Sequence, residues 1–172
     1  MTVPLALAGE PDNVHGTMRG MDPMDEVTGA RISVTRRLAW HETDASGHNH
    51  FAAAMRWAEE AEHQLYRCLG HVEHTPRIPR VHVEVDYQAR LYFNDLITVR
   101  LGVVKVGASS CTYAFAINRE DGERAVSGRM IIVHASSTTE GSAPWPDALR
   151  LALAAPRDFA MAVSDWMAVD RP

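Results

Sequence analysis

Residues 48–69 read H-N-H-F-A-A-A-M-R-W-A-E-E-A-E-H-Q-L-Y-R-C-L. Positions three or four residues apart share one face of a helix, and here that face would carry Phe51, Ala54, Met55, Ala58, Glu62, Leu65 and Leu69. The alanines favour helix, and Gly70 stands where a glycine cap belongs. The stretch therefore predicts one helix of about 22 residues, roughly 33 Å long.

The sequence on both sides of this helix changes to a period of two, which is typical of strands with one buried face. Before the helix, even-numbered positions from Ile32 to Trp40 are mostly apolar, and after it apolar residues alternate from Val81 to Phe93. Further strands are predicted at 97–103, 111–117 and 130–133, joined by short turns such as Asn94-Asp95 and Asp121-Gly122. Short connections require antiparallel pairing. We therefore predict an α+β domain in which an antiparallel five-stranded sheet wraps around one long helix.

The flanking segments lack such periodicity. Residues 1–29 predict a loose N-terminal arm, residues 30–136 the folded domain, and residues 137–172 a C-terminal extension. In that extension, residues 148–155 are compatible with a short helix between two prolines. Trp145 and Trp166 indicate that part of it packs on something, a neighbouring subunit being one option.

Length and composition exclude several classes of protein. The 172 residues fit one domain, and a net charge of −5 is the opposite of the basic excess typical of nucleic-acid binders. No apolar run approaches the ~20 residues of a membrane span, and the apolar opening has no basic residue before it, so neither a membrane protein nor a secretory signal is expected. Cys68 and Cys111 form no metal or redox spacing and predict reduced thiols in a cytoplasmic protein.

The densest polar cluster, H-E-T-D-A-S-G-H-N-H, occupies residues 41–50, between the first strand and the helix. Asp44 or Ser46 could cap the helix by accepting free backbone N–H groups. The same geometry could serve catalysis, because a helix start polarises a carbonyl oxygen beside a carboxylate acting as nucleophile or general base. Spacing alone leaves both interpretations open.

Metal binding receives less support. His48 and His50 with Asp44 offer suitable ligand types, but residues two apart on a helix diverge by about 200°. The other histidines are interpreted as surface or satisfied core groups: His15, His63, His71, His74, His82 and His134. No phosphate-binding loop, dinucleotide fingerprint or G-x-S-x-G is present. Glu59, beside the helix stripe, is either solvated or functional, whereas Glu60 is assigned to the surface.

The stretch T-D-A-S-G-H-N-H-F-A-A-A-M-R-W-A-E-E-A-E, residues 43–62, resembles the T-D-x-x-G-H-V-N-N…E-E-A-R signature of hotdog-fold acyl-CoA thioesterases of the 4-hydroxybenzoyl-CoA thioesterase type. V-x-V-D-Y at 83–87 and G-x-S-S at 107–110 are also similar to that family. Asn49 and His50 replace the usual V-N, and Glu62 stands where arginine is common. The resemblance covers about residues 31–135 and implies the hotdog fold.

The resemblance also assigns roles. It implies that Asp44 is the catalytic aspartate, with His48 beside it, and that Glu59 matches the catalytic glutamate of another branch of the fold. Substrate contacts are implied for Gly47, His50, Phe51, Ser109 and Ser110, with the backbone N–H of Phe51 polarising the carbonyl. Neither a metal nor another cofactor is implied.

The expected activity is hydrolysis of an acyl thioester, carried by CoA or by an acyl-carrier protein. The expected assembly is a homodimer with a continuous sheet and active sites at the subunit interface, or a tetramer built from such dimers. A non-catalytic hotdog module that binds acyl-CoA is the alternative.

Overall fold

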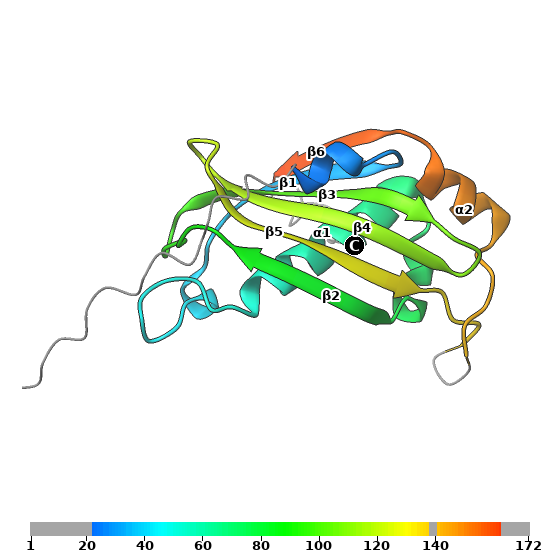
Figure 1. The fold of residues 1–172 in the computed structure, drawn as a ribbon, viewed down its shortest axis with the longest axis horizontal. Coiled ribbons are helices and arrows are strands. Elements are labelled where there is room, and N and C mark those ends of the chain that lie inside the picture. The colour runs from blue at the N-terminus through cyan, green and yellow to red at the C-terminus, as the bar shows by residue number, and fades with distance from the viewer. Residues whose placement is uncertain (1–21, 138–140, 163–172) are drawn as a thin grey trace, which may run out of the picture.

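The computed structural model describes residues 22–137 and 141–162 (Figure 1). Its strands are β1 (Arg31–Arg37), β2 (Arg80–Tyr87), β3 (Leu96–Val106), β4 (Ser110–Arg119), β5 (Arg124–Val133) and β6 (Asp158–Ala162). Its α-helices are α1 (Ala53–Leu69) and α2 (Asp147–Ala154), and its 3-10 helices are η1 (Pro23–Glu26), η2 (Trp40–Glu42) and η3 (Val72–Arg77). None of the helices within these residues is long and apolar enough to cross a membrane.

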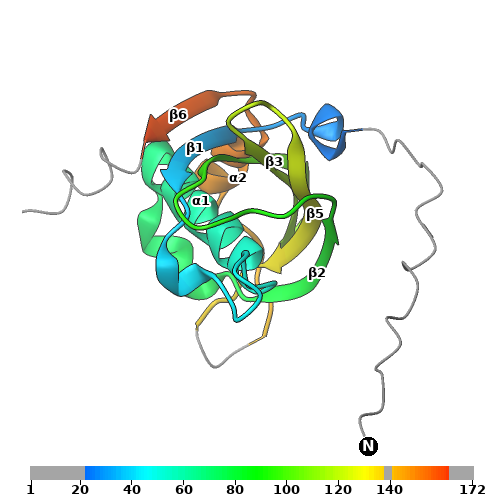
Figure 2. The ribbon, with the colours of Figure 1, turned by 90° about the vertical axis from the view of Figure 1, so that its left-hand side faces the viewer.

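The strands form one sheet in the order β2-β5-β4-β3-β1-β6, curved around α1 (Figure 2). The α+β class and the wrapped helix are as predicted, and α2 matches the short helix expected at residues 148–155, but the sheet has six strands, not five. The sixth strand, β6, pairs in parallel with β1, and Phe159 and Met161 pack against the core. A five-residue strand that reaches the sheet through a crossover leaves too short a pattern to be recognised in sequence.

Helix α1 begins five residues later than predicted and buries most of the predicted face, shifted to include Trp57 and Ala61. Its buried residues include Ala54, Trp57, Ala58, Ala61 and Leu65, whereas Phe51 is 64% exposed and Met55 38% exposed. Small alanine side chains let the helix axis lie close to the sheet, and Trp57 fills the remaining space. Gly70 closes the helix in the left-handed conformation at φ 79°, as expected for a glycine cap.

The long alternation from Val81 to Phe93 is not one strand. β2 ends at Tyr87, and the chain then leaves the sheet and crosses beside the loop that precedes α1. Leu91 is fully buried there, and its N–H donates to the Asn49 side chain at 3.1 Å. The prediction failed because the period of two continues by residue type through irregular chain, in which Leu91 is buried but Phe93 is 55% exposed.

Both flanking segments contact the domain. Within the N-terminal segment predicted to be loose, Met24 of η1 is buried against Ala114 and Ala116, while residues 1–21 lie outside the described part. At the other end, Trp145 is buried within its own chain, and its indole N–H donates to the Ser110 carbonyl at 3.1 Å. Trp166 lies outside the described residues.

A buried carboxylate joins β1, η2 and α1. Glu42, 8% exposed, accepts hydrogen bonds at 2.7 Å from Arg36, from the indole N–H of Trp57 and from the backbone N–H of Ala39. Arg36 also lies over the Trp57 ring at 5.7 Å and pairs with the exposed Glu60 at 2.6 Å. Both carboxylate oxygens of Glu42 therefore accept hydrogen bonds, as a buried charge requires.

A second buried carboxylate lies farther along α1. Glu62 is fully buried and contacts Arg80 of β2, while its Oε1 has no hydrogen-bond partner among the described residues. Burial raises the pKa of Glu62 to about 7, the largest cause being loss of solvation, with Arg80 opposing it. The native protein therefore holds a proton on this carboxyl that the unfolded chain releases near its ordinary pKa of 4.5.

We predict that Glu42→Gln lowers the free energy of unfolding by about 3 kcal/mol, because it leaves Arg36 without its buried partner. Glu60→Gln is the matched control, since Glu60 pairs with the same arginine but has an exposed side chain, and should cost less than about 1 kcal/mol. Urea denaturation measures both. An equal loss of unfolding free energy in the two variants would contradict the structural role of Glu42.

We also predict that stability falls as pH rises from 4.5 towards 7, by about 3 kcal/mol in total, through Glu62. In this range the native state binds more protons than the unfolded state, so raising the pH favours unfolding. Glu62→Gln cannot titrate, and the difference in unfolding free energy between wild type and variant should change with pH and level off above 7. A difference that stays constant with pH would contradict the assignment.

Candidate active site

The loop between η2 and α1 folds back on itself at Gly47. The Asp44 N–H donates to the His48 carbonyl, and the Gly47 N–H donates to the Asp44 carbonyl, both at 3.0 Å. Gly47 has φ +81°, a conformation that costs a residue with a side chain about 1–2 kcal/mol. The sequence D-A-S-G-H therefore forms a tight reversal that presents its side chains to solvent.

Three residues of this loop, His48, Asn49 and His50, fix it to the rest of the fold. Asn49 is buried, its N–H donates to the Leu91 carbonyl at 2.8 Å, and its side chain accepts from the Leu91 N–H. His48 forms an isolated β-bridge with Tyr92, and the His50 N–H donates to the Glu42 carbonyl at 2.8 Å. Asn49, which departs from the family pattern, therefore has a structural role.

The Asp44 carboxylate is the first member of a hydrogen-bonded line. It accepts from the Ser46 backbone N–H at 2.8 Å and from the Ser46 hydroxyl, and that hydroxyl lies 2.9 Å from Nε2 of His48. These Ser46 hydrogen bonds, first that of the side chain and then that of the backbone, lower the pKa of Asp44. Asp44 is therefore ionised at neutral pH, as a base or nucleophile must be.

The start of α1 is capped by neither Asp44 nor Ser46, so that interpretation of the two residues is wrong. Nδ1 of His50 accepts the Ala52 N–H at 3.1 Å, and the His50 carbonyl accepts the Ala53 N–H at 2.9 Å. The N–H of Phe51 has no acceptor within the part of the chain that the structure describes. It is a free donor at the positive end of the helix dipole.

These groups border one open depression with a volume of about 410 Å³. It lies between the loop, the start of α1 and the end of β2, and is lined by Asp44, His48, Asn49, Phe51, Tyr87, Gln88, Ala89 and Arg90. The Tyr87 hydroxyl donates to the Phe51 carbonyl and so connects β2 to the helix start. Sequence reasoning missed Tyr87, Gln88 and Arg90, which reach the site only because the chain turns away after β2.

The remaining candidates lie elsewhere. Glu59 does not line the depression, and its carboxylate pairs with Arg80 at 3.0 Å on a half-exposed side of α1. Ser109 and Ser110 lie at the turn between β3 and β4. The Asp44 loop lies at the other end of β3, where His48 forms a β-bridge with Tyr92 and the Tyr92 carbonyl accepts the Asp95 N–H. The length of β3, about 30 Å or more, separates them within one chain.

Comparisons with known proteins agree with this architecture. The sequence model of the thioesterase-like superfamily matches residues 38–153. A solved structure described as a predicted thioesterase from Bacillus stearothermophilus is 26% identical, with a TM-score of 0.64, and the match covers 72% of this chain and 93% of that one.

Two further solved structures share the fold at lower identity. A 1,4-dihydroxy-2-naphthoyl-CoA thioesterase from Synechocystis is 18% identical with a TM-score of 0.64, covering 72% of this chain and 95% of that one. A thioesterase from Thermus thermophilus, complexed with coenzyme A and zinc, is 22% identical with a TM-score of 0.65, covering 72% and 97%. The superfamily match extends over more than half of the chain, from before the Asp44 loop to α2. The chain therefore belongs to the thioesterase-like superfamily and has the hotdog fold of its thioesterases.

Proposed function

We propose that the protein hydrolyses an acyl thioester of CoA or of an acyl-carrier protein, with Asp44 as general base or nucleophile. The observation that carries this proposal is that an ionised carboxylate and a free backbone N–H at a helix start border the same depression. Thioester hydrolysis needs both groups: one to activate water or attack the carbonyl carbon, and one to stabilise the negative charge on its oxygen.

In the proposed reaction the thioester oxygen accepts the Phe51 N–H, aided by the dipole of α1. Asp44 takes a proton from a water molecule, whose oxygen bonds to the carbonyl carbon. The tetrahedral intermediate then expels the thiolate, which receives the proton, and leaves the free acid. Ser46 and His48 hold the carboxylate in place through their hydrogen-bonded line.

Two points support a substrate carried on a phosphate-bearing arm such as that of CoA. Two fold relatives are a CoA thioesterase and a thioesterase complexed with coenzyme A. Arg90 is exposed at the rim of the depression, where its guanidinium would suit the phosphates of a CoA or carrier-protein arm. Ser109 and Ser110 would contribute to this binding from a second copy of the chain, since they lie far from Asp44 within one copy.

We further propose that the active form is a homodimer joined at β2. This strand is at the edge of the sheet. Val83 and Val85 share one face, of which Val85 packs against the core, and Val81 lies at an irregularity in the pairing of β2 with β5. Val81 is 59% exposed and Val83 37% exposed, an apolar edge that soluble proteins normally cover. A second copy at β2 would also enclose the depression, which adjoins Tyr87 at the end of that strand.

Two alternatives remain to be distinguished. If Glu59 were the essential carboxylate, Asp44 would serve only to shape the loop. If the protein were a binding module, acyl-CoA would bind without thiol release. The exposed Asp44, hydrogen-bonded in its ionised form, favours the catalytic proposal, because a module that only binds needs no carboxylate beside the carbonyl.

We predict that Asp44→Asn lowers kcat by at least ~10² on acyl-CoA substrates, because the amide accepts the same hydrogen bonds but cannot take a proton. Thiol release from a panel of acyl chain lengths measures this. The wild-type rate should not change with Asp44 ionisation near neutral pH and should fall only in acid, since the pKa of Asp44 is lowered.

Asp121→Asn is the matched control for this experiment. Asp121 accepts the backbone N–H of Glu123, two residues further on, at 2.9 Å, as Asp44 accepts that of Ser46, but it lies outside the depression. Its variant should keep full activity. If the Asp44→Asn enzyme is fully active, Asp44 is not the catalytic carboxylate and Glu59 takes that role, in which case Glu59→Gln should abolish turnover. If wild type binds acyl-CoA tightly without turnover, the binding module is favoured.

We predict that Val83→Arg weakens self-association, because it places a charge in the apolar edge of β2. Light scattering should give twice 19.0 kDa, or a multiple of it, for wild type and a smaller species for the variant. Leu151→Arg, a similar change at a 65% exposed position of α2, should leave the mass unchanged. A wild-type monomer at micromolar concentration would refute the dimer.

A further inference from the structure

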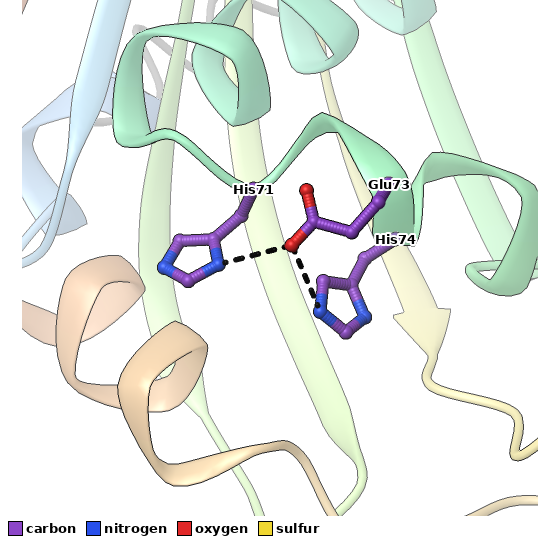
Figure 3. Close-up of side chains that lie close together, drawn as sticks. All are labelled: His71, Glu73 and His74. Carbon is purple, nitrogen blue, oxygen red and sulfur yellow. Dashed lines mark ion pairs between the residues drawn. The ribbon is translucent and has the colours of Figure 1, made fainter.

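A compact group of metal-ligating side chains follows α1, at the opposite end of that helix from the Asp44 loop. His71, Glu73 and His74 belong to the first turn of η3, where the His74 N–H donates to the His71 carbonyl at 3.1 Å. In a 3-10 turn, residues three apart lie above one another. This places both imidazoles on the same side of the chain, facing Glu73 (Figure 3).

The two rings share one oxygen atom of the carboxylate. Oε1 of Glu73 lies 3.6 Å from Nδ1 of His71 and 3.5 Å from Nε2 of His74, and all three atoms lie within 4.8 Å of one another. These separations are longer than N–H···O hydrogen bonds, which measure about 2.7–3.2 Å. They are close to the ~3.3 Å between two ligands of one tetrahedral zinc ion with bonds of about 2.0–2.1 Å.

A second observation at the same place concerns buried nitrogen atoms without partners. Nδ1 of His74 and Nε2 of His134 are buried and have no hydrogen-bond partner among the described residues. His134 is 5% exposed, its ring lies 5.5 Å from that of His74, and its Nδ1 lies 3.1 Å from the Pro144 carbonyl oxygen. In the neutral ring that contact puts the proton on Nδ1 and leaves a lone pair on Nε2. An unpartnered buried lone pair is costly, and a hydrated cation beside it is one source of a donor.

We propose that His71, Glu73 and His74 bind one Zn²⁺ ion, with solvent in the remaining coordination position. Imidazole nitrogen and carboxylate oxygen are ligands that zinc accepts, whereas calcium and magnesium prefer oxygen alone. The Glu73 side chain is 62% exposed, that of His71 21% and that of His74 14%. The proposed ion could therefore enter from solvent on the side of Glu73 and be partly buried by the two histidines.

The proposed ion stabilises the connection between α1 and β2. The end of η3 is already attached to the sheet, because the Ala135 N–H donates to the Arg77 carbonyl at 2.9 Å. Its first turn is held by the backbone hydrogen bond from His74 to His71. Zinc would cross-link that turn beside α2 and His134, and so act on stability and not on the Asp44 chemistry.

Isothermal titration of metal-free full-length protein with zinc sulfate tests the proposal. We expect one Zn²⁺ per chain, and an increase in Tm of about 5–10 °C when free zinc exceeds its Kd about 100-fold. His71→Ala and His74→Ala should each weaken binding by more than ~10², since even neighbours of metal ligands cost 10–100-fold. Cobalt(II) should give a visible d–d spectrum with wild type that these variants lose.

Two further variants separate loss of the ligand from loss of the fold. Glu73→Gln changes an exposed side chain, should leave the metal-free Tm unchanged, and should still weaken zinc binding. His82→Gln is the matched control, because His82 and Glu84 form a histidine–glutamate pair at 3.8 Å that has no third metal-ligating side chain beside it among the described residues. Binding that is absent in wild type, that survives in Glu73→Gln and His74→Ala, or that His82→Gln weakens equally would overturn the proposal.

Discussion

The carboxylate of Glu42 is the point at which the strand, the loop and the helix of this domain are joined. The carboxylate binds the guanidinium of Arg36 from β1, the indole of Trp57 from α1 and the backbone N–H of Ala39 before η2. The backbone carbonyl of Glu42 accepts the His50 N–H. The loop that carries Asp44 therefore begins after Glu42, and its other end is hydrogen-bonded back to Glu42. Because a buried charge is tolerated only when its partners are in place, the position of α1 and the shape of the loop are set together.

In a single chain, hydrogen bonds fix the conformation of the Asp44 loop, but Asp44 is exposed to solvent. Its carboxylate is ionised and oriented by Ser46, yet fully exposed to solvent, where the hydrogen bonds keep its pKa low. A carboxylate with a low pKa is a weak base. Enclosure of the depression by a second copy at β2 would remove water and so strengthen the electrostatic interactions of both the carboxylate and the Phe51 N–H with the reacting thioester. The proposed dimer and the proposed chemistry thus depend on each other.

The interior of α1 shows how one departure from the family pattern is accommodated. Glu62 occupies a position where arginine is common, and Arg80 of β2 supplies the positive charge from the opposite side of the contact. The pair still leaves one carboxylate oxygen without a partner, which is why burial dominates the pKa of Glu62. The same arginine holds Glu59, so Glu59 and Glu62 form one structural unit with β2.

The sequence by itself determined the class of fold, the long helix and the polar loop before it, because these follow from periodicity and from local turn chemistry at Gly47 and Gly70. It also indicated Asp44 and Phe51 as candidate site residues, and these two are near each other along the chain. Only the tertiary structure decided the rest. Contacts between distant segments decide how far the buried face of α1 extends, where β2 ends, that β6 is added, and that His134 groups with His74. Packing and burial act through space, and no local pattern of residues encodes which distant partner a side chain will meet.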